Sequence, residues 1–167
     1  FIFHAPMNKH TTFKIGGEAD VLIFPSTAEE VSKIFKLIEL FSLPCTVLGN
    51  GSNVLVLDKG IRGAVVKFTE EFFGDMRCEG QRLIACAGAK LKDVSNFAAQ
   101  NGLTGLEFAC GIPGSIGGAI FMNAGAYGAE MKNVIASVKA VTRDGEFVEF
   151  SGAGLDLGYR RSIFQEN

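Results

Sequence analysis

Clusters of metal-binding side chains are missing from this sequence of 167 residues. It has two histidines and four cysteines, and no two of the cysteines form a C-x-x-C pair. Zinc and iron–sulfur sites need such thiolate and imidazole ligands close together. The sequence therefore predicts no metal site, and it predicts cysteines that stay reduced in the cytoplasm.

Long apolar runs and an excess of positive charge are missing as well. No stretch reaches the ~18 apolar residues that a membrane-spanning helix needs. Residues 1–9 lack the charged start and the apolar run of a secretory signal. The net charge is -2 and the pI is about 5.7, so the chain lacks the basic face that nucleic-acid binding requires. We expect neither a membrane nor a nucleic acid as a partner.

Glycine, in contrast, is abundant. The chain has 21 glycines, roughly twice the ~7% share of an average protein. They are dense between Gly102 and Gly128, which is typical of a backbone that turns tightly or approaches a ligand closely. Hydrophobic residues make up 47% of the chain and charged residues 20%, so one compact domain or two small lobes can bury a core.

The first part of the chain predicts a β-α-β-β arrangement. An apolar run over residues 20–24 predicts a buried strand. Ser26 and Thr27, each followed three residues later by a glutamate, form a capping-box pattern that opens a helix, and this helix is expected to stop near Pro44. Further apolar strands are predicted at 46–48, 54–57 and 64–68. Such nearly continuous apolar strands are usually covered on both faces.

The second part predicts a strand pair, a helix and a hairpin. The strand pair covers residues 72–78 and 82–87. The amphipathic helix begins near Leu91 and ends at Asn101–Gly102. The hairpin strands, 134–142 and 146–150, flank Asp144-Gly145, a strong turn signal. We expect the boundary between two lobes near residues 69–71, so that the lobes comprise residues 1–69 and 70–167.

The first of two glycine-rich loops lies between predicted strands and consists of Gly49, Asn50, Gly51, Ser52 and Asn53. Glycines let successive N–H groups converge on an anion, and Ser52 and Asn53 add side-chain donors. The dinucleotide fingerprint fails, because Val54 stands at its third glycine and a strand is predicted next. A phosphate cradle and a plain strand-to-strand turn explain these residues about equally well.

The second glycine-rich loop consists of Gly111, Ile112, Pro113, Gly114, Ser115, Ile116, Gly117 and Gly118. Gly114-Ser115 is expected to open a short helix whose N-terminus faces an anion. Ile112 and Ile116 beside bare backbone suit a flat aromatic cofactor. The alternative is a glycine-lined helix that packs tightly on a sheet. Two such loops in one small chain favour a dinucleotide site.

Three further features carry weaker signals. In Tyr159-Arg160-Arg161-Ser162, an arginine fork can match a carboxylate, although the residues taken alone favour a solvated surface pair of arginines. The histidines, His4 and His10, are interpreted as surface residues. Cys110 is interpreted as a small buried hydrophobe rather than a ligand contact.

Together the motifs resemble those of the UDP-N-acetylenolpyruvoylglucosamine reductase family over nearly the whole chain. Any one motif is unspecific, but their ordered combination is specific. The motifs are Thr11-Thr12-Phe13-Lys14-Ile15-Gly16-Gly17-Glu18-Ala19-Asp20, Leu48 to Leu55, the Asp58/Gly60/Gly63 spacing, Gly105-Leu106-Glu107 followed by Gly111 to Gly118, Asn123 to Gly128, and Tyr159 to Ser162.

The resemblance implies an α+β fold of the vanillyl-alcohol-oxidase type, with mixed sheets, helices and FAD clasped between two lobes. It implies an oxidoreductase that uses FAD and NADPH to convert UDP-N-acetylglucosamine enolpyruvate, a nucleotide sugar, to UDP-N-acetylmuramate for cytoplasmic peptidoglycan precursor synthesis. In the family a third, substrate-binding domain carries the proton-donating serine, and a glutamate near the C-terminus is also catalytic. We expect this chain to lack both and to be inactive alone, so that it shows no substrate-dependent NADPH oxidation.

Site residues carry over from the family position by position. Both glycine-rich loops, together with Asn123 and Gly125, are expected to bind the cofactor. Tyr127 and Tyr159 are expected near the substrate, and Arg160 matches the catalytic arginine. The serine that follows the arginine pair does not match the proton donor.

Two other functions stay open from the residues. One is an oxidase or dehydrogenase of the same fold that acts on a hydroxy acid or a sugar lactone, which oxygen reactivity and electron-donor preference would distinguish. The other is a non-catalytic module that binds a nucleotide or a partner protein. The oligomeric state is open, and self-association is expected if an apolar surface lies uncovered.

Overall fold

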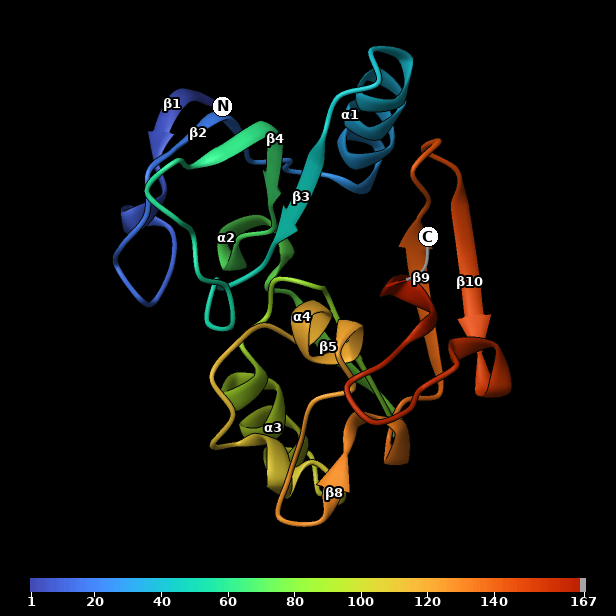
Figure 1. Cartoon of the computed structure of the whole chain (residues 1–167). Helices are drawn as coiled ribbons and strands as arrows, with labels where there is room; N and C mark the ends of the chain where they lie inside the picture. Colours follow the sequence, from blue (N-terminus) through green and yellow to red (C-terminus); the bar gives the residue numbers. More distant parts are fainter. Residues whose placement is uncertain (166–167) are drawn as a thin grey trace.

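A four-stranded sheet and one long helix form the upper part of the molecule in Figure 1. The computed structural model describes residues 1–165. In the sheet, the strand order is β1-β2-β4-β3. Strands β2, β4 and β3 are parallel, and β1 pairs with β2 in the antiparallel sense. The strands are β1 (Ile2–Pro6), β2 (Glu18–Ile23), β3 (Cys45–Leu48) and β4 (Ile61–Lys67).

Helix α1 (Ala28–Leu40) connects β2 to β3, and its start confirms the predicted capping pattern. The Thr27 hydroxyl accepts a hydrogen bond from the Glu30 amide at 3.1 Å. The Glu30 carboxylate in turn accepts from the backbone N–H and the hydroxyl of Ser26, at 2.8 and 2.7 Å. These bonds from Ser26 lower the pKa of Glu30. They satisfy amides that would otherwise lack partners at the helix start.

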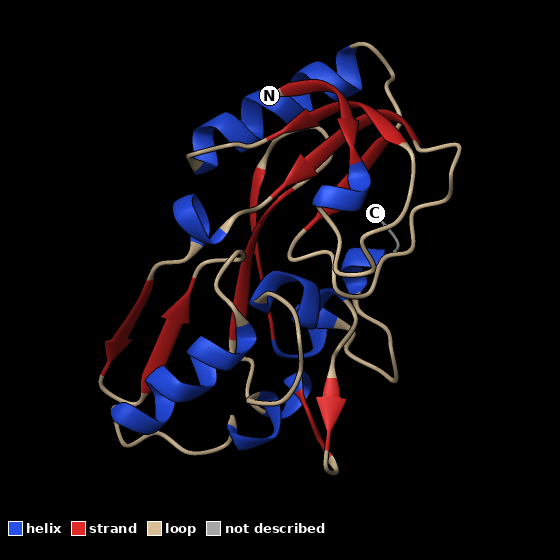
Figure 2. Cartoon of the chain, turned by 90° about the vertical axis from the view of Figure 1, so that its left-hand side faces the viewer, coloured by secondary structure: helices blue, strands red, loops and turns tan. Residues whose placement is uncertain are grey.

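Apolar side chains cover both faces of the sheet, as predicted. Ala64 and Val66 of β4 pack with Ile38 of α1, and Figure 2 shows α1 lying along this face. Val65, between them in sequence, points to the other face and packs with Leu22. Alternation along the strand thus places one core under the helix and one on the opposite side.

Two segments differ from the predicted strands. Residues 54–57 form no strand: Val56 is buried, but the segment pairs with its neighbours only through the Leu57 carbonyl, which accepts from the amides of Gly17 and Gly60 at 3.0 and 2.9 Å among the described residues. Residues 54–57 have the apolar pattern of a strand, but no other strand within residues 1–165 pairs with them. Strand β1 was not predicted. Its large apolar residue Phe3 is exposed and its small residue Ala5 is buried, so the apolar pattern does not mark the buried face.

Shorter elements make up much of the rest of the molecule. The helices are α2 (Glu70–Phe73), α3 (Leu91–Gln100) and α4 (Ile116–Phe121), and the strands are β5 (Met76–Glu79), β6 (Arg82–Ala85), β7 (Gly125–Ala126) and β8 (Ala129–Glu130). In Figure 1, α2 lies in the upper part near the sheet, whereas α3, α4, β5 and β8 lie below it. Short 3₁₀ turns are η1 (Met7–Lys9), η2 (Glu107–Ala109), η3 (Met131–Asn133), η4 (Gly152–Leu155) and η5 (Ile163–Gln165). The predicted strand at 72–78 begins too early, because glutamates after Thr69 favour the helix α2 there.

The hairpin of β9 (Ser137–Val141) and β10 (Phe147–Ser151) reaches back to α1. The buried Ser32 hydroxyl of α1 donates to the Gly145 carbonyl at 2.6 Å, and Lys36 pairs with Glu146 at 2.9 Å. Figure 1 shows this hairpin on the right, extending up toward α1. Its contact joins the second part of the chain to the first, and the lobe boundary near residues 69–71 stays a prediction.

Candidate flavin site

The two glycine-rich loops lie side by side, although about sixty residues separate them in the sequence. The Ser52 hydroxyl donates to the Pro113 carbonyl at 3.0 Å. The Ser115 side chain lies so close to Gly49 that a Cβ there would overlap its hydroxyl. The predicted short helix after Ser115 is α4, which begins at this junction. A single surface is therefore built from both loops.

Carbonyl groups of the first loop are turned into the protein. The Gly49 carbonyl accepts from Lys67 Nζ at 2.7 Å, and the Gly51 carbonyl accepts from the amide and the hydroxyl of Thr12 at 3.1 and 3.2 Å. A trans peptide points its C=O and the following N–H in opposite directions. The amides of Asn50 and Ser52 are therefore directed away from these partners.

Free amide donors remain at the junction of the loops. Within residues 1–165, no protein acceptor binds the backbone N–H of Asn50, Ser52, Asn53, Gly114 or Ser115. The Asn53 side chain makes only a weak contact, from Nδ2 to the Met122 sulfur at 3.5 Å. Backbone donors without a protein partner are satisfied by water or by a ligand, and grouped donors of this kind bind anions.

Five of the six glycines of the loops fall into three groups by physical requirement. Gly51 and Gly114 have φ values of 68° and 143°, which other residues adopt only with strain. A Cβ at Gly49 would overlap the Ser115 hydroxyl, and a Cβ at Gly117 would be crowded by Ala87. Gly111 has neither requirement: its φ is ordinary, it is exposed, and a Cβ would meet open space. The fold alone does not explain a glycine at Gly111.

Asn123 ties the segment after α4 to the arginine motif. Its side chain is buried, and Nδ2 donates to the Gly158 carbonyl at 2.8 Å and to Glu130 Oε2 at 2.6 Å. Its Oδ1 accepts from the Lys132 amide at 2.9 Å. Both amide hydrogens are thus used inside the protein, so Asn123 positions the Gly158 turn. A contact with a cofactor, as predicted for Asn123 and Gly125, stays a prediction.

The arginine motif forms a tight turn. Gly158 and Arg161 exchange two backbone hydrogen bonds, of 3.0 and 3.2 Å, which leaves Tyr159 and Arg160 at the tip. Ser162 is fully buried and donates to the Phe121 carbonyl at 2.6 Å, so its hydroxyl serves the structure. This agrees with the expectation that this serine is not a proton donor.

The two arginines of the motif have different surroundings. Arg161 pairs with Asp156 at 2.7 Å, whereas no hydrogen-bond or ion-pair partner binds the exposed Arg160 guanidinium within the described part of the chain. Arg160 has a φ of 54°, a left-handed conformation that costs a non-glycine residue about 1–2 kcal/mol. Strained, unpaired residues of this kind are concentrated at functional sites. Both arginines are nevertheless exposed, as a solvated surface pair would be, so the catalytic role of Arg160 stays a prediction.

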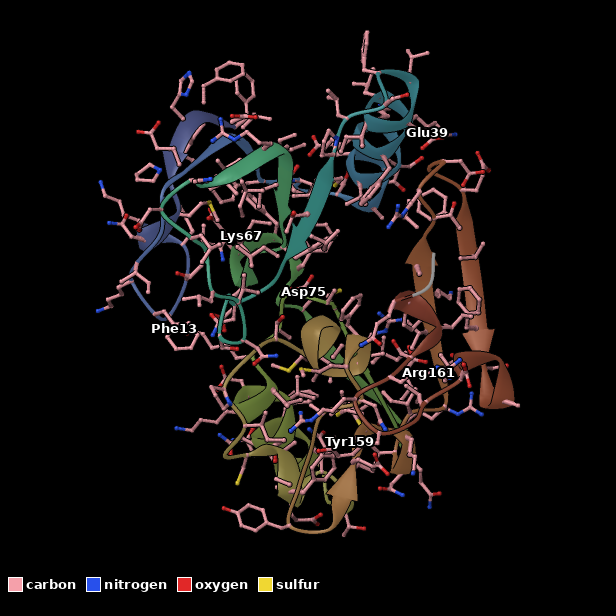
Figure 3. The ribbon with its side chains drawn as sticks, viewed as in Figure 1. Phe13, Glu39, Lys67, Asp75, Tyr159 and Arg161 are labelled. Carbon is pink, nitrogen blue, oxygen red and sulfur yellow. The ribbon has the colours of Figure 1, made fainter. Side chains whose placement is uncertain are left out.

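The predicted substrate tyrosines are almost fully exposed, Tyr127 at 92% and Tyr159 at 90%. Tyr127 lines an open hollow of about 550 Å³ with Phe108 and Val134, and no residue of either glycine-rich loop is among the residues that line it. A second hollow, of about 510 Å³, is lined by Ile135 and Leu155 among others. Figure 3 places Tyr159 in the lower part of the molecule and Lys67 in the upper part.

Several smaller predictions are decided by the structure. Cys110 is exposed, so its interpretation as a buried hydrophobe is wrong. His4 is exposed, whereas His10 is half-buried against the Phe24 ring, and burial followed by the charge of Lys67 lowers its pKa. No group of three metal-binding side chains occurs among residues 1–165. No helix in that range is long and apolar enough to cross a bilayer.

Thr12 and Lys67 support the first loop, although the sequence patterns did not single out either residue for this role. Thr12 is one of ten residues in a single motif, where nothing marks it apart from its neighbours. The available signal for Lys67 was a lone lysine at the end of an apolar strand, where a charge is unusual unless it has a partner.

A family model described as an FAD binding domain matches residues 19–151. The chain belongs to this FAD-binding domain family. The UDP-N-acetylenolpyruvoylglucosamine reductase of Clostridium botulinum (strain Hall) is 52% identical over 161 residues, which are 96% of this chain and 52% of that protein. The chain thus spans about half the length of the curated relatives that it matches. The family resemblance of the ordered motifs is confirmed.

Solved structures agree with this assignment. The UDP-N-acetylenolpyruvylglucosamine reductase from Thermus caldophilus superposes with a TM-score of 0.77 at 36% identity, over 93% of this chain and 54% of that one. A solvent-stable cholesterol oxidase superposes with a TM-score of 0.67 at 16% identity, over 80% of this chain and 30% of that one, and it shows the fold alone. The expected fold class, the flavin-binding α+β fold of the vanillyl-alcohol-oxidase type, is confirmed.

Proposed function

We propose that the chain binds FAD where the Gly49–Asn53 and Gly111–Gly118 loops meet, as the flavin-binding part of a reductase. The main supporting observation is that the two adjoining loops carry several backbone amides without a protein acceptor within residues 1–165. A pyrophosphate carries several acceptor oxygens on neighbouring phosphates, which such a set of donors can bind. Gly111 supports the fit, because bare exposed backbone lets a flat ring approach closely.

The proposed reaction is the NADPH-dependent reduction of UDP-N-acetylglucosamine enolpyruvate, as the names of the relatives suggest. Bound FAD would supply the hydride chemistry for the double bond. Arg160 would bind the enolpyruvyl carboxylate through two parallel hydrogen bonds and stabilise the negative charge that develops there. Tyr159, adjacent at the tip of the same turn, would contact the substrate. Gly125 beside the cofactor, Tyr127 near the substrate and a cytoplasmic location also belong to this proposal.

A direct test is a titration of the purified chain with FAD, followed by flavin fluorescence and by absorption spectra. We expect saturable binding and a perturbed flavin spectrum. A colourless protein that shows no saturable change with FAD would refute the proposal and favour the non-catalytic alternative. Rapid reaction of the bound, reduced flavin with oxygen, together with indifference to NADPH, would favour an oxidase of the same fold.

Gly111→Ala is expected to weaken FAD binding without harming the fold. The new methyl group meets open space in the free protein, and alanine lowers the entropy of the unfolded chain, so stability should stay equal or rise by about 0.5 kcal/mol. In the complex the methyl group would occupy the space of the cofactor and lower its affinity about ten-fold, or ~1.4 kcal/mol. FAD titration and thermal unfolding measure the two effects.

The matched control is Gly154→Ala. Gly154 is also exposed and has an ordinary φ, and no atom lies within 4 Å of the place that a Cβ would take, but it lies in η4, outside both loops. This variant should bind FAD like the parent chain. Equal FAD affinity of the Gly111 and Gly154 variants would remove Gly111 from the site.

A further inference from the structure

We propose that Lys67 is the counter-charge for the phosphate groups held on the Gly49–Asn53 loop and the residue that positions this loop. The inference rests on the proposed flavin function and extends it to a residue behind the loop. Lys67 is a positioning residue here, since its ammonium contacts the loop's backbone.

Lys67 stands where the strands of the parallel sheet end. It is the last residue of β4 and pairs in register with Leu48, the last residue of β3. The first glycine-rich loop begins directly after Leu48. Lys67 Nζ donates to the Gly49 carbonyl at 2.7 Å and to the His10 carbonyl at 3.2 Å. Figure 3 shows Lys67 in the upper part of the molecule with the sheet. Ligands of open α/β sheets bind beyond this carboxyl edge.

The ammonium of Lys67 has no carboxylate partner among residues 1–165. Lys36, Lys90 and Lys132 each pair with a carboxylate, whereas no Asp or Glu within residues 1–165 pairs with Lys67. Burial lowers the pKa of Lys67 from its ordinary value, because the charged form is poorly solvated there. A half-buried cation without a counter-charge is unfavourable. An anion on the adjacent loop would relieve that cost.

The same contact also orients the loop. With the Gly49 carbonyl held toward Lys67, the Asn50 amide of the same peptide unit points the opposite way. Thr12 holds the Gly51 carbonyl in a comparable manner. Lys67 therefore contributes twice to anion binding, through its positive charge and through the direction of a backbone donor.

If Lys67 had a structural role alone, it would connect the carbonyls of residues 10 and 49 and would have no specific effect on anion binding. The two roles differ in which ligands they affect. A phosphate-specific role predicts a loss for FAD and for inorganic pyrophosphate but not for riboflavin, which has the flavin ring and no phosphate. A purely structural role predicts equal changes for flavins with and without phosphates, or no change at all.

The experiment compares the parent chain with Lys67→Met, Lys67→Arg and the control Lys92→Met, which removes an exposed lysine on α3. Each is titrated with FAD, riboflavin and inorganic pyrophosphate at low salt, and its unfolding is followed by circular dichroism. We expect Lys67→Met to lose about ten-fold or more in affinity for FAD and pyrophosphate, because both the nearby positive charge and the contact that orients the Asn50 amide are removed. Riboflavin binding should stay unchanged, Lys67→Arg should restore most of the affinity, and Lys92→Met should match the parent.

Each outcome decides between the roles. Unchanged affinity of Lys67→Met for FAD and pyrophosphate, or an equal loss for FAD and riboflavin, overturns the proposal. If Lys67→Met does not fold, the proposal is tested instead with Lys67→Arg and with the salt dependence of pyrophosphate binding. In that case, a parent chain that does not bind pyrophosphate refutes the proposal. A parent that binds pyrophosphate but not FAD sinks the flavin function while leaving Lys67 as an anion partner.

Discussion

Gly60→Ala is expected to destabilise the fold by more than about 3 kcal/mol, a larger loss than any other substitution proposed for this chain. A Cβ at Gly60 would overlap the Glu18 carbonyl oxygen, at the point where β2 begins beside β4. Gly60 also has a φ of 72°, which strains alanine. Neither backbone can retreat without breaking the pairing in the middle of the sheet. Denaturant unfolding with a linear extrapolation measures the loss.

Two other glycines separate the causes of this loss. Gly80 has a φ of 61° with no atom near a Cβ, so Gly80→Ala reports strain alone, at about 1–2 kcal/mol. Gly154→Ala adds neither strain nor overlap and should stay within about 0.5 kcal/mol of the parent. If Gly60→Ala costs no more than Gly80→Ala, the tight contact between β2 and the start of β4 does not exist as described.

Arg160→Gly is expected to lower turnover at least about 100-fold while the fold stays intact. The guanidinium would no longer stabilise negative charge on the substrate carboxylate. Glycine, however, adopts the left-handed conformation of this position without strain, so stability should hold or rise by up to about 1 kcal/mol. A suitable assay is substrate-dependent NADPH oxidation by a chimera in which these residues replace the matching half of the Clostridium botulinum reductase.

Ser42→Gly is the matched control for Arg160→Gly. Ser42 has a φ of 49° just after α1 and is exposed, so glycine relieves a similar strain outside both loops and the arginine motif. The control chimera should gain similar stability and keep its turnover. Retention of activity by the Arg160→Gly chimera would contradict the proposed role, and loss of activity by both variants would trace the effect to the backbone.

Local patterns predicted the helices and turns well. The cap at Thr27, the apolar spacing of α3 and the Asp144-Gly145 turn each depend on contacts within a few residues, and the structure contains all three elements. The family resemblance was likewise available from ordered motifs. Strands were less certain, because a strand exists only with a partner: residues 54–57 have the apolar pattern without the ladder.

The composition of the site could be read along the chain, whereas its assembly could not. The glycine-rich loops and the arginine pair were recognised as motifs from their residues, and their detailed roles stay predictions. Three features of the site depend on contacts between distant segments of the described chain. Ser52 donates to the Pro113 carbonyl, Asn123 donates to the Gly158 carbonyl, and Lys67 donates to the Gly49 carbonyl without a carboxylate partner among residues 1–165. These contacts form only when the chain folds. They could not be predicted, because a hydrogen bond between residues tens of positions apart leaves no periodic pattern in the sequence. Burial in the folded chain likewise lowers the pKa of Lys67, and no pattern in the sequence shows that burial.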